Sequence, residues 1–266
     1  MKGVILAGGT GSRLLPLTTI TNKHLLPVYD KPMIYYPIEA LVSAGVTDIM
    51  VVTGGNHAGE FLRLLKSGKQ FGCNLQYAYQ EQAGGIAEAL GLAEEFIDYD
   101  KVVVVLGDNI FGSSIRPYVE RFASQPTGGR ILLKEVDHPE AYGVPIIEQE
   151  RLILIQEKPS HPRSRYAVVG LYMYDALVWE ILQTLRPSGR GELEITDVNN
   201  AYIDRGQMAY DVVKGWWGDA GESIEAYRAA FNYVAEHGAN HNNDASQPAR
   251  ATTPSNDDAR LAGAPA

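Results

Sequence analysis

Short apolar runs alternate with longer segments of helical periodicity through the first half of the chain. The predicted strands cover 3–9, 48–55, 75–80, 101–108 and 130–136. The runs at 3–9, 48–55 and 101–108 are apolar without alternation, which is typical of strands buried on both faces of a parallel sheet. The predicted helices cover 32–44, 58–67, 84–96 and 113–124. The first opens with Pro32, and the last has Pro117 in its first turns. The pattern predicts an α/β fold with a doubly wound, mainly parallel sheet and helices on both faces.

The second half of the chain predicts a smaller β-rich part. Two adjoining runs, 144–150 and 151–159, are expected to form a hairpin. The remaining predicted elements are a strand at 166–175, helices at 177–185 and 192–206, a strand at 208–215 and a helix at 223–238, with Gly206 and Gly238 as helix stops. Residues 239–266 are rich in Asn, Asp, Ala and Pro and predict a disordered polar tail after a single domain over 1–238.

Composition narrows the class of protein. The chain has 266 residues, a hydrophobic fraction of 45% and a formal net charge of −9. This acidic balance argues against binding to nucleic acid or to an anionic membrane, since both require basic patches. The single cysteine, Cys73, excludes an intramolecular disulfide and a cysteine-based zinc site. With no secretory leader pattern and no apolar stretch of membrane-spanning length, we expect a cytoplasmic protein.

The segment AGGTGSRL, residues 7–14, follows the first predicted strand. Its glycine spacing does not fit the dinucleotide fingerprint, and it lacks the Gly-Lys pair of a P-loop. A Gly-rich loop at the carboxyl end of a buried strand can bring backbone N–H groups close to an anion, and Arg13 adds a fork of donors. Lys23 follows on a segment without clear periodicity. Alternatively, the loop is an ordinary turn with a solvated arginine, and Lys23 is a surface lysine.

Two aspartates stand at the ends of predicted strands. Asp108 ends the buried run VVVVLGD, where a carboxylate reaches the ligand edge of a parallel sheet and suits Mg²⁺. Asp219, in WWGDAGE, follows the last predicted strand and precedes the last helix. Each has a structural alternative as a capping or turn aspartate.

Several ordered motifs resemble those of the sugar-1-phosphate nucleotidyltransferases. The opening GGTGSRLLPLTTITNKHLLPVYDKP is similar to the family signature, with Ser12 for the usual Thr, and LGDNIF, YGV, EKP, YAVVGLYMYD and GELEITDVN follow in order. The resemblance extends to about residue 235. In detail, the motifs resemble those of the glucose-1-phosphate thymidylyltransferases. The resemblance is to the short form of that family, because the tail does not resemble the C-terminal region of long-form members. One departure is GDAGE, where many relatives have a Leu-Asp-Thr-Gly pattern.

The resemblance implies a Rossmann-like nucleotidyltransferase fold and a role for each matching residue. The residues implied to hold the nucleoside triphosphate are Gly8, Gly11, Ser12, Arg13, Lys23, Gln80, Gly85 and Asp108. Those implied to form the sugar-phosphate pocket are Asn109, Tyr142, Gly143, Glu157, Lys158, Val169 and Tyr172, with Arg190 and Glu192 nearby. Asp108 and Asp219 are the implied Mg²⁺ ligands, and Arg13, Lys23 and Lys158 the catalytic cations. Val169 and Tyr172 could instead be core residues, and Glu157 and Lys158 an exposed pair.

The implied reaction is thymidylyl transfer from dTTP to α-D-glucose 1-phosphate, giving dTDP-glucose and pyrophosphate. The sugar phosphate is itself a charged oxygen nucleophile, so no Ser, Cys or His nucleophile is needed. The alternatives are uridylyl or other nucleotidyl transfer to a related hexose 1-phosphate, and a catalytically silent nucleotide-sugar-binding protein. The expected partners are the small-molecule substrates and further copies of the chain in a homo-oligomer.

Overall fold

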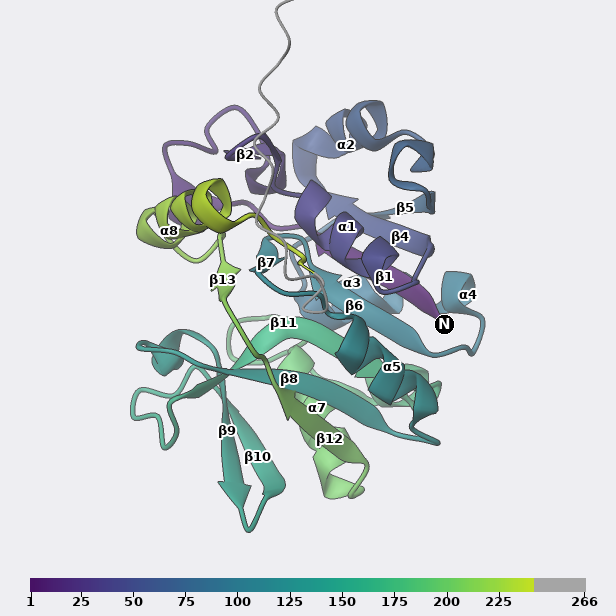
Figure 1. Cartoon of the computed structure of the whole chain (residues 1–266). Coiled ribbons are helices and arrows are strands. Elements are labelled where there is room, and N and C mark those ends of the chain that lie inside the picture. Colours follow the sequence, from purple (N-terminus) through teal and green to yellow (C-terminus); the bar gives the residue numbers. More distant parts are fainter. Residues whose placement is uncertain (242–266) are drawn as a thin grey trace, which may run out of the picture.

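A seven-stranded sheet forms the centre of the molecule (Figure 1). The computed structural model describes residues 1–241. The strand order is β12 (Met208–Val212), β8 (Gly129–Glu135), β11 (Tyr166–Tyr174), β6 (Val102–Leu106), β1 (Lys2–Ala7), β4 (Asp48–Gly54) and β5 (Asn74–Gln80). β1 pairs in parallel with β4 and β6, whereas β11 runs antiparallel to both β6 and β8. The predicted mainly parallel sheet is confirmed.

Helices cover both faces of this sheet because its central strands are apolar on both sides. One apolar cluster lies under α1 (Tyr35–Ser43), α2 (Ala58–Leu65) and α5 (Arg116–Ser124). A second lies under α3 (Ile86–Gly91), α4 (Glu94–Ile97), α6 (Leu177–Thr184) and α7 (Ile195–Asp204). Alternate residues of one strand feed the two clusters: in β6, Val102 and Val104 join the second and Val103 and Val105 the first. The predicted doubly wound arrangement follows from this alternation.

A smaller unit brings the end of the chain back beside the middle of the sequence. β13 (Trp217–Asp219) pairs with β7 (Asn109–Phe111) so that Asp219 lies opposite Asn109. The following helix α8 (Ile224–His237) is capped by Ser223, whose hydroxyl accepts a hydrogen bond from the Ala226 N–H at 3.0 Å. α8 packs on a third apolar cluster, which includes Ile110 and Val234. This pairing places Asp219 next to the end of the buried β6–β7 segment.

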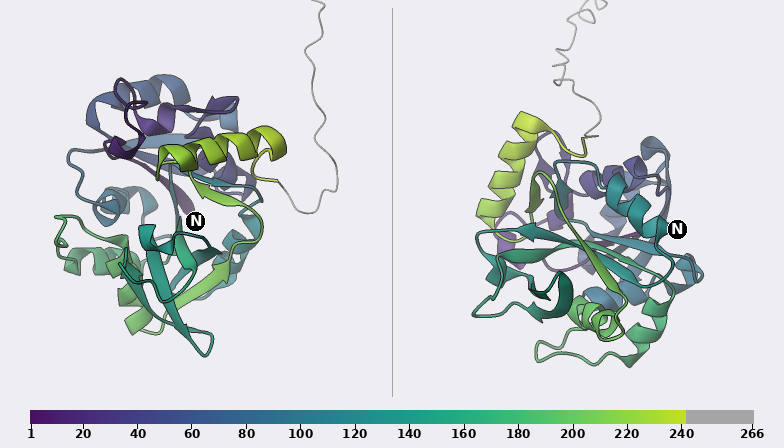
Figure 2. Two further views of the ribbon diagram at one scale, coloured as in Figure 1. Left: turned by 90° about the vertical axis from the view of Figure 1, so that its left-hand side faces the viewer. Right: turned by 60° about the horizontal axis from the view of Figure 1, so that its bottom comes forward.

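Two hairpins complete the described elements. β9 (Gly143–Glu148) and β10 (Arg151–Glu157) form the predicted hairpin, which projects at the end of the molecule opposite α8 (Figures 1 and 2). β2 (Pro27–Val28) and β3 (Lys31–Pro32) form a short hairpin that sequence periodicity did not predict.

Four predicted helix boundaries are wrong, and in each case backbone contacts explain the difference. The segment expected to open a helix at Pro32 instead ends strand β3 and then turns at Met33 and Ile34, whose N–H groups donate to the carbonyls of Leu26 and His24 at 2.9 Å. Helix α1 therefore begins at Tyr35. The expected helix 113–124 begins at Arg116, because Ser113 forms a parallel β-bridge with His241, in which the Ser114 N–H donates to the His241 carbonyl at 2.8 Å.

The other two differences share one cause. The Leu193 N–H donates to the Gly84 carbonyl at 2.8 Å, and the Ala87 N–H donates to the Leu193 carbonyl at 3.2 Å. This mutual pairing holds both segments outside helical geometry, so α3 begins at Ile86 and α7 at Ile195. The expected helix 84–96 is also divided in two after Gly91.

The first three residues of the predicted disordered tail, 239–241, are ordered in the described structure. The Asn240 N–H donates to the Phe111 carbonyl at 2.8 Å, and the His241 N–H to the Gly112 carbonyl at 3.1 Å. Residues 239–241 are therefore fixed to the main body of the protein, and the rest of the predicted tail, 242–266, lies outside the described residues. Among residues 1–241, no helix has the length and apolar character needed to cross a membrane.

Candidate active site

A cleft of about 410 Å³ opens at the carboxyl ends of β1 and β6, where open α/β sheets bind ligands. It gathers residues from the Gly-rich loop, the β6–β7 turn, the hairpin β9–β10 and the segment before α7. The predicted site residues that line it are Gly8, Gly11, Ser12, Arg13, Lys23, Gln80, Gly85, Asp108, Asn109, Tyr142, Gly143, Glu157, Lys158, Tyr172, Arg190, Glu192 and Asp219.

Val169 is the one predicted site residue whose side chain does not line the cleft. It is fully buried in the apolar cluster under α1, α2 and α5, on the other face of the sheet. Its neighbours Val168 and Gly170 line the cleft instead. The reason is strand alternation, because successive side chains of β11 point to opposite faces. The side chain of Val169 therefore belongs to the core, and only the backbone of this residue is left to serve the sugar-phosphate pocket.

The Gly-rich loop requires glycine at the positions where the backbone turns. Gly9 and Gly11 have φ angles of 92° and 64°, in the left-handed region that favours glycine. The Thr18 hydroxyl donates to the Gly11 carbonyl at 2.8 Å and ties the loop to the segment that leads to Lys23. Arg13 then stands half exposed at the rim of the cleft. The loop is thus a shaped turn that carries a cation.

At the floor of the cleft, one lysine is paired with an aspartate, and a second aspartate is close enough to affect both. The Lys23 ammonium donates to Asp108 Oδ2 at 2.5 Å. Burial opposes the charged form of Lys23, but the carboxylates of Asp108 and Asp219 outweigh it and raise its pKa. Burial likewise disfavours ionised Asp108, yet Lys23 holds its pKa well below the usual range. Both groups of this pair are therefore charged at neutral pH.

Asp219 lacks such a partner and behaves differently. Burial, and then the negative charge of Asp108, raise the pKa of Asp219 to about 7. Two carboxylates at one site repel each other, and a cation placed between them relieves the repulsion. The Asp219 Oδ1 accepts one hydrogen bond from the Gly221 N–H at 3.0 Å. The pair of aspartates therefore carries more negative charge than Lys23 alone compensates.

This donor set fits a divalent metal that is completed by its substrate. Mg²⁺ commonly binds one or two carboxylates together with phosphate oxygens and water, rather than a cage of protein ligands. Within residues 1–241, no three His, Cys, Asp or Glu side chains gather closely enough to hold a metal by themselves. Asp108 and Asp219 supply the two carboxylates that a metal shared with substrate phosphates requires.

The close packing at this centre depends on Gly221. A Cβ on Gly221 would lie 2.2 Å from Asp108 Oδ2 and 2.8 Å from Lys23 Nζ. The Ala220 N–H also donates to the Asp108 carbonyl at 2.9 Å. The turn after β13 is therefore packed directly against the Lys23–Asp108 pair, a feature that the sequence did not reveal.

We expect Gly221→Ala to lower the free energy of unfolding by about 1–3 kcal/mol, the usual cost of overpacking a dense site. Gly59→Ala is the matched control, because a Cβ there meets no atom within 4 Å and lies on an α-helix. Urea denaturation measures both variants. Equal stability of the two would contradict this account of the packing.

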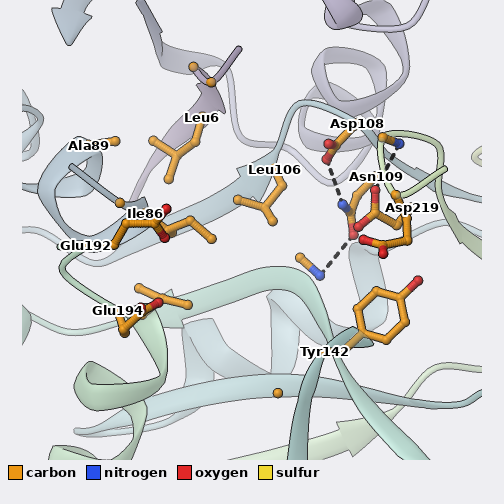
Figure 3. Close-up of a pocket in the computed structure, with 18 of the residues that line it drawn as sticks. Leu6, Ile86, Ala89, Leu106, Asp108, Asn109, Tyr142, Glu192, Glu194 and Asp219 are labelled. Carbon is orange, nitrogen blue, oxygen red and sulfur yellow. Dashed lines mark hydrogen bonds between the residues drawn. The ribbon is translucent and has the colours of Figure 1, made fainter. Parts of the chain in front are cut away.

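Asn109 binds protein groups with both ends of its amide. Its Nδ2 donates to Asp108 Oδ1 at 3.0 Å (Figure 3). Its Oδ1 accepts from the Gly170 N–H at 2.9 Å and from the Trp217 indole N–H at 2.8 Å. A Cβ on Gly170 would lie within 2.7 Å of this amide. Asn109 thus orients Asp108 and joins β7, β11 and β13.

One end of the cleft carries a group of apolar side chains, with Glu192 beside Ile86 (Figure 3). The side chains of Leu6, Ile86, Ala89 and Leu106 lie there, away from Asp108 and Asp219 (Figure 3). Gln80 is buried beside them, and its Nε2 donates to Glu88 Oε2 at 2.9 Å and to the Gly85 carbonyl at 3.2 Å. Gly85 has a φ of 104°, and a Cβ on it would lie 2.4 Å from the Leu193 carbonyl oxygen. This end suits a flat ring with polar edges.

The other predicted pocket residues form a network of glutamates around Arg190. Its Nη2 lies 3.3 Å from Glu157, 3.5 Å from Glu192 and 2.7 Å from Glu194. The Thr196 hydroxyl donates to the second oxygen of Glu157 at 2.6 Å. The sequence did not single out Thr196 or Glu194, although both lie within the quoted GELEITDVN motif.

Two tyrosines and one lysine complete this side of the cleft. Burial, and then neighbouring carboxylates, raise the pKa of Tyr142 and of Tyr172, so both remain neutral phenols that can donate a hydrogen bond. Lys158 is exposed at the end of β10 with a φ of 44°, and its N–H donates to the Tyr142 carbonyl at 3.0 Å. The left-handed backbone conformation of Lys158 ends the hairpin strand at the edge of the cleft, which this residue lines. Hydroxyl-rich and anionic ligands match these groups.

His24 lines the cleft but does not act as a base there. Burial, and then the charge of Lys23, lower the pKa of His24 to about 3, so the imidazole is neutral at physiological pH. Its Nδ1 donates to Asn22 Oδ1 at 2.7 Å, since that oxygen also accepts the His24 N–H. The imidazole ring packs directly against Gly107, because a Cβ on that glycine would lie 2.8 Å from Cδ2 of His24. This agrees with a reaction that requires no histidine.

Comparison with known proteins shows the family to which the chain belongs. The sequence model of the nucleotidyl transferase family matches residues 2–237. A glucose-1-phosphate thymidylyltransferase of Actinoplanes is 48% identical over 238 residues, which are 88% of this chain and 78% of the relative.

Two solved structures share the fold. One is described as a putative glucose-1-phosphate thymidylyltransferase from Bacillus anthracis in complex with a sucrose; it is 51% identical with a TM-score of 0.85, over 88% of this chain and 95% of its own. The other, a UDP-glucose pyrophosphorylase complexed with UDP-glucose, is 27% identical with a TM-score of 0.77, over 88% and 98%. The chain therefore belongs to the nucleotidyl transferase family, as a relative of the glucose-1-phosphate thymidylyltransferases.

Proposed function

We propose that the protein transfers a thymidylyl group from dTTP to α-D-glucose 1-phosphate, releasing pyrophosphate and forming dTDP-glucose. The observation that carries the proposal is the cleft itself. It holds Arg13, Lys23 and two aspartates beside an apolar end that contains Gln80, and a tyrosine- and glutamate-lined wall that contains Lys158. Relatives named glucose-1-phosphate thymidylyltransferase, at up to 48% identity, support the choice of substrates.

The chain's own residues contribute positioning and charge. Gly8, Gly11, Ser12, Arg13 and Lys23 bind the triphosphate, and Gln80 and Gly85 the base. The attacking phosphate oxygen is already anionic, so no protein base removes a proton. Holding two substrates in reactive geometry can contribute about 7–11 kcal/mol to lowering the barrier.

The sugar phosphate occupies the other wall. Lys158 binds its phosphate, and Tyr142, Gly143, Glu157 and Tyr172 hold the hydroxyl groups. Asn109 keeps Asp108 in place through its 3.0 Å hydrogen bond. Asp108 and Asp219 would hold Mg²⁺, which would supply Lewis-acid neutralisation of the charge that develops on the phosphates. Family members of this kind use a divalent metal, and Mg²⁺ is our proposal for its identity.

The choice of nucleotide is directly testable. dTTP and UTP differ by the C5 methyl of the base and by the 2′-hydroxyl of the ribose, whereas dUTP differs from dTTP by the methyl alone. We expect kcat/KM to be higher for dTTP than for UTP, and at least about 10-fold higher for dTTP than for dUTP, because a methyl group in an apolar pocket contributes about 10- to 200-fold. The residues that line the apolar end, Leu6, Ile86, Ala89 and Leu106, supply such a surface. Initial rates of pyrophosphate release with glucose 1-phosphate and MgCl₂ measure these ratios. Equal or faster turnover with UTP would favour uridylyl transfer, and the 27% identical structure is that of a UDP-glucose pyrophosphorylase.

Three further expectations accompany this function as proposals. The catalytic domain covers 1–238, the protein acts in the cytoplasm, and it assembles as a homo-oligomer. Gel filtration with light scattering measures the last of these.

A further inference from the structure

Glu222 lies at the cleft but has no part in the proposed reaction. It follows the turn after β13, and its Oε2 lies 2.5 Å from Nη1 of Arg13. Both side chains line the cleft, and they are 51% exposed for Arg13 and 26% for Glu222. The ion pair therefore joins the Gly-rich loop to the segment that carries Asp219.

The two ends of this ion pair are fixed to different degrees. Gly221 packs against Asp108 and Lys23 without room for a Cβ, and Ser223 caps α8 directly after Glu222. The backbone on both sides of Glu222 is therefore held in place. Arg13 instead sits in one short 3₁₀ turn, Ser12–Leu14, directly after the left-handed Gly11. If the pair opens, the long arginine side chain is the part that moves.

A triphosphate bound by the Gly-rich loop needs the same guanidinium. The inference thus rests on the proposed function, which places the triphosphate at Arg13. Charge-assisted hydrogen bonds from arginine to carboxylate and to phosphate use the same fork of N–H donors. A phosphate oxygen that takes Nη1 displaces Glu222 from it.

We propose that Glu222 is a positioning residue that holds Arg13 in the free enzyme and competes with the triphosphate for it. The carboxylate then sets nucleotide affinity rather than the rate of transfer. It also eases release of pyrophosphate, because Arg13 has a second anionic partner to return to. A purely structural ion pair at this exposure would contribute little to stability and nothing to nucleotide affinity.

The test compares Glu222→Gln with Glu225→Gln. Glu225 lies in the first turn of α8, three residues after Glu222, and is exposed, so its variant removes the same charge from the same region without touching Arg13. Isothermal titration with Mg²⁺ and sodium tripolyphosphate measures affinity for the triphosphate alone. We expect Glu222→Gln to bind it about 3- to 10-fold more tightly than wild type, a range set by the usual strength of half-exposed charged pairs. Glu225→Gln should stay near wild type.

A double-mutant cycle separates competition for Arg13 from general repulsion. In an Arg13→Ala background, Glu222→Gln should no longer change the affinity for tripolyphosphate, because the group being competed for is gone. With dTTP as substrate, Glu222→Gln should lower KM without raising kcat.

The inference is overturned by any of three results with tripolyphosphate: equal shifts in the two glutamine variants, a Glu222→Gln effect that persists without Arg13, or no binding to the wild-type protein. Because this arm contains no nucleoside, it is independent of whether dTTP is the substrate. A failure of dTTP turnover alone would contradict the proposed function and leave the tripolyphosphate comparison intact.

Discussion

Replacing Asp108 by asparagine is expected to lower turnover at least about 100-fold, the scale of losing one electrostatic stabiliser of a reacting group. Asp108 is one of the two carboxylates that fit a metal, and it is the hydrogen-bonded partner of Lys23 at 2.5 Å. Asparagine preserves the shape of the side chain but leaves Lys23 without its charged partner. It also weakens the donor set for a hard divalent cation, which prefers carboxylate oxygens.

Asp204→Asn is the matched control for this variant. Asp204 is exposed at the end of α7, away from the cleft lining. Pyrophosphate release under saturating substrates and MgCl₂ measures turnover, and thermal unfolding verifies that each variant is folded. Near-normal turnover of a folded Asp108→Asn protein would remove Asp108 from the mechanism.

Arg13→Ala is the second change for which we expect a loss of about 100-fold in turnover. Arg13 is half exposed, and its one ion pair among the described residues is with Glu222, so its removal should leave the fold intact. The loss instead reflects the missing fork of donors for the triphosphate. Arg13→Lys should recover only part of the activity, because an ammonium keeps the charge but not the planar donor geometry.

Arg63→Ala provides the comparison for Arg13→Ala. Arg63 is an exposed cation on α2 that does not line the cleft. Both variants are compared by steady-state kinetics with dTTP and glucose 1-phosphate. If Arg13→Ala loses no more activity than Arg63→Ala, the Gly-rich loop does not bind the triphosphate in the way proposed.

The fold could be predicted because the buried strands have unbroken apolar runs. The segments that form β1, β4 and β6 are apolar on both faces, which is typical of central strands in a parallel sheet covered by helices on both sides. Gly206 and Gly238 marked helix ends correctly, with φ angles of 65° and 72°. These signals are local, so they can be read without knowledge of distant contacts.

The errors arise where distant contacts override local preference. Pro32 and Pro37 both suit the first turn of a helix, and the structure uses Pro37 because Met33 and Ile34 are hydrogen-bonded to residues 24–26. Likewise, the pairing of Gly84 with Leu193 shortens two helices at once. No periodicity within either segment contains that information.

In the candidate site, too, residues in local motifs could be predicted, whereas contacts between distant segments could not. Asp108 and Lys23 could be predicted, because both stand in recognisable motifs and the sheet topology brings them to one edge. The side-chain placement of Val169 could not be inferred from its motif alone, since it depends on which face of β11 meets the cleft. Glu222 and Gly221 lie within the quoted GDAGE, but their contacts with Arg13 and Asp108 depend on the pairing of β13 with β7.

The central claim is that the cleft joins the two substrates directly, with the sugar phosphate as the nucleophile. ³¹P NMR of the wild-type enzyme with dTTP and MgCl₂, before and after addition of glucose 1-phosphate, tests it most directly. We predict no pyrophosphate before the addition, and equimolar dTDP-glucose and pyrophosphate after it. Pyrophosphate released without the sugar phosphate, or no dTDP-glucose with it, would contradict the account.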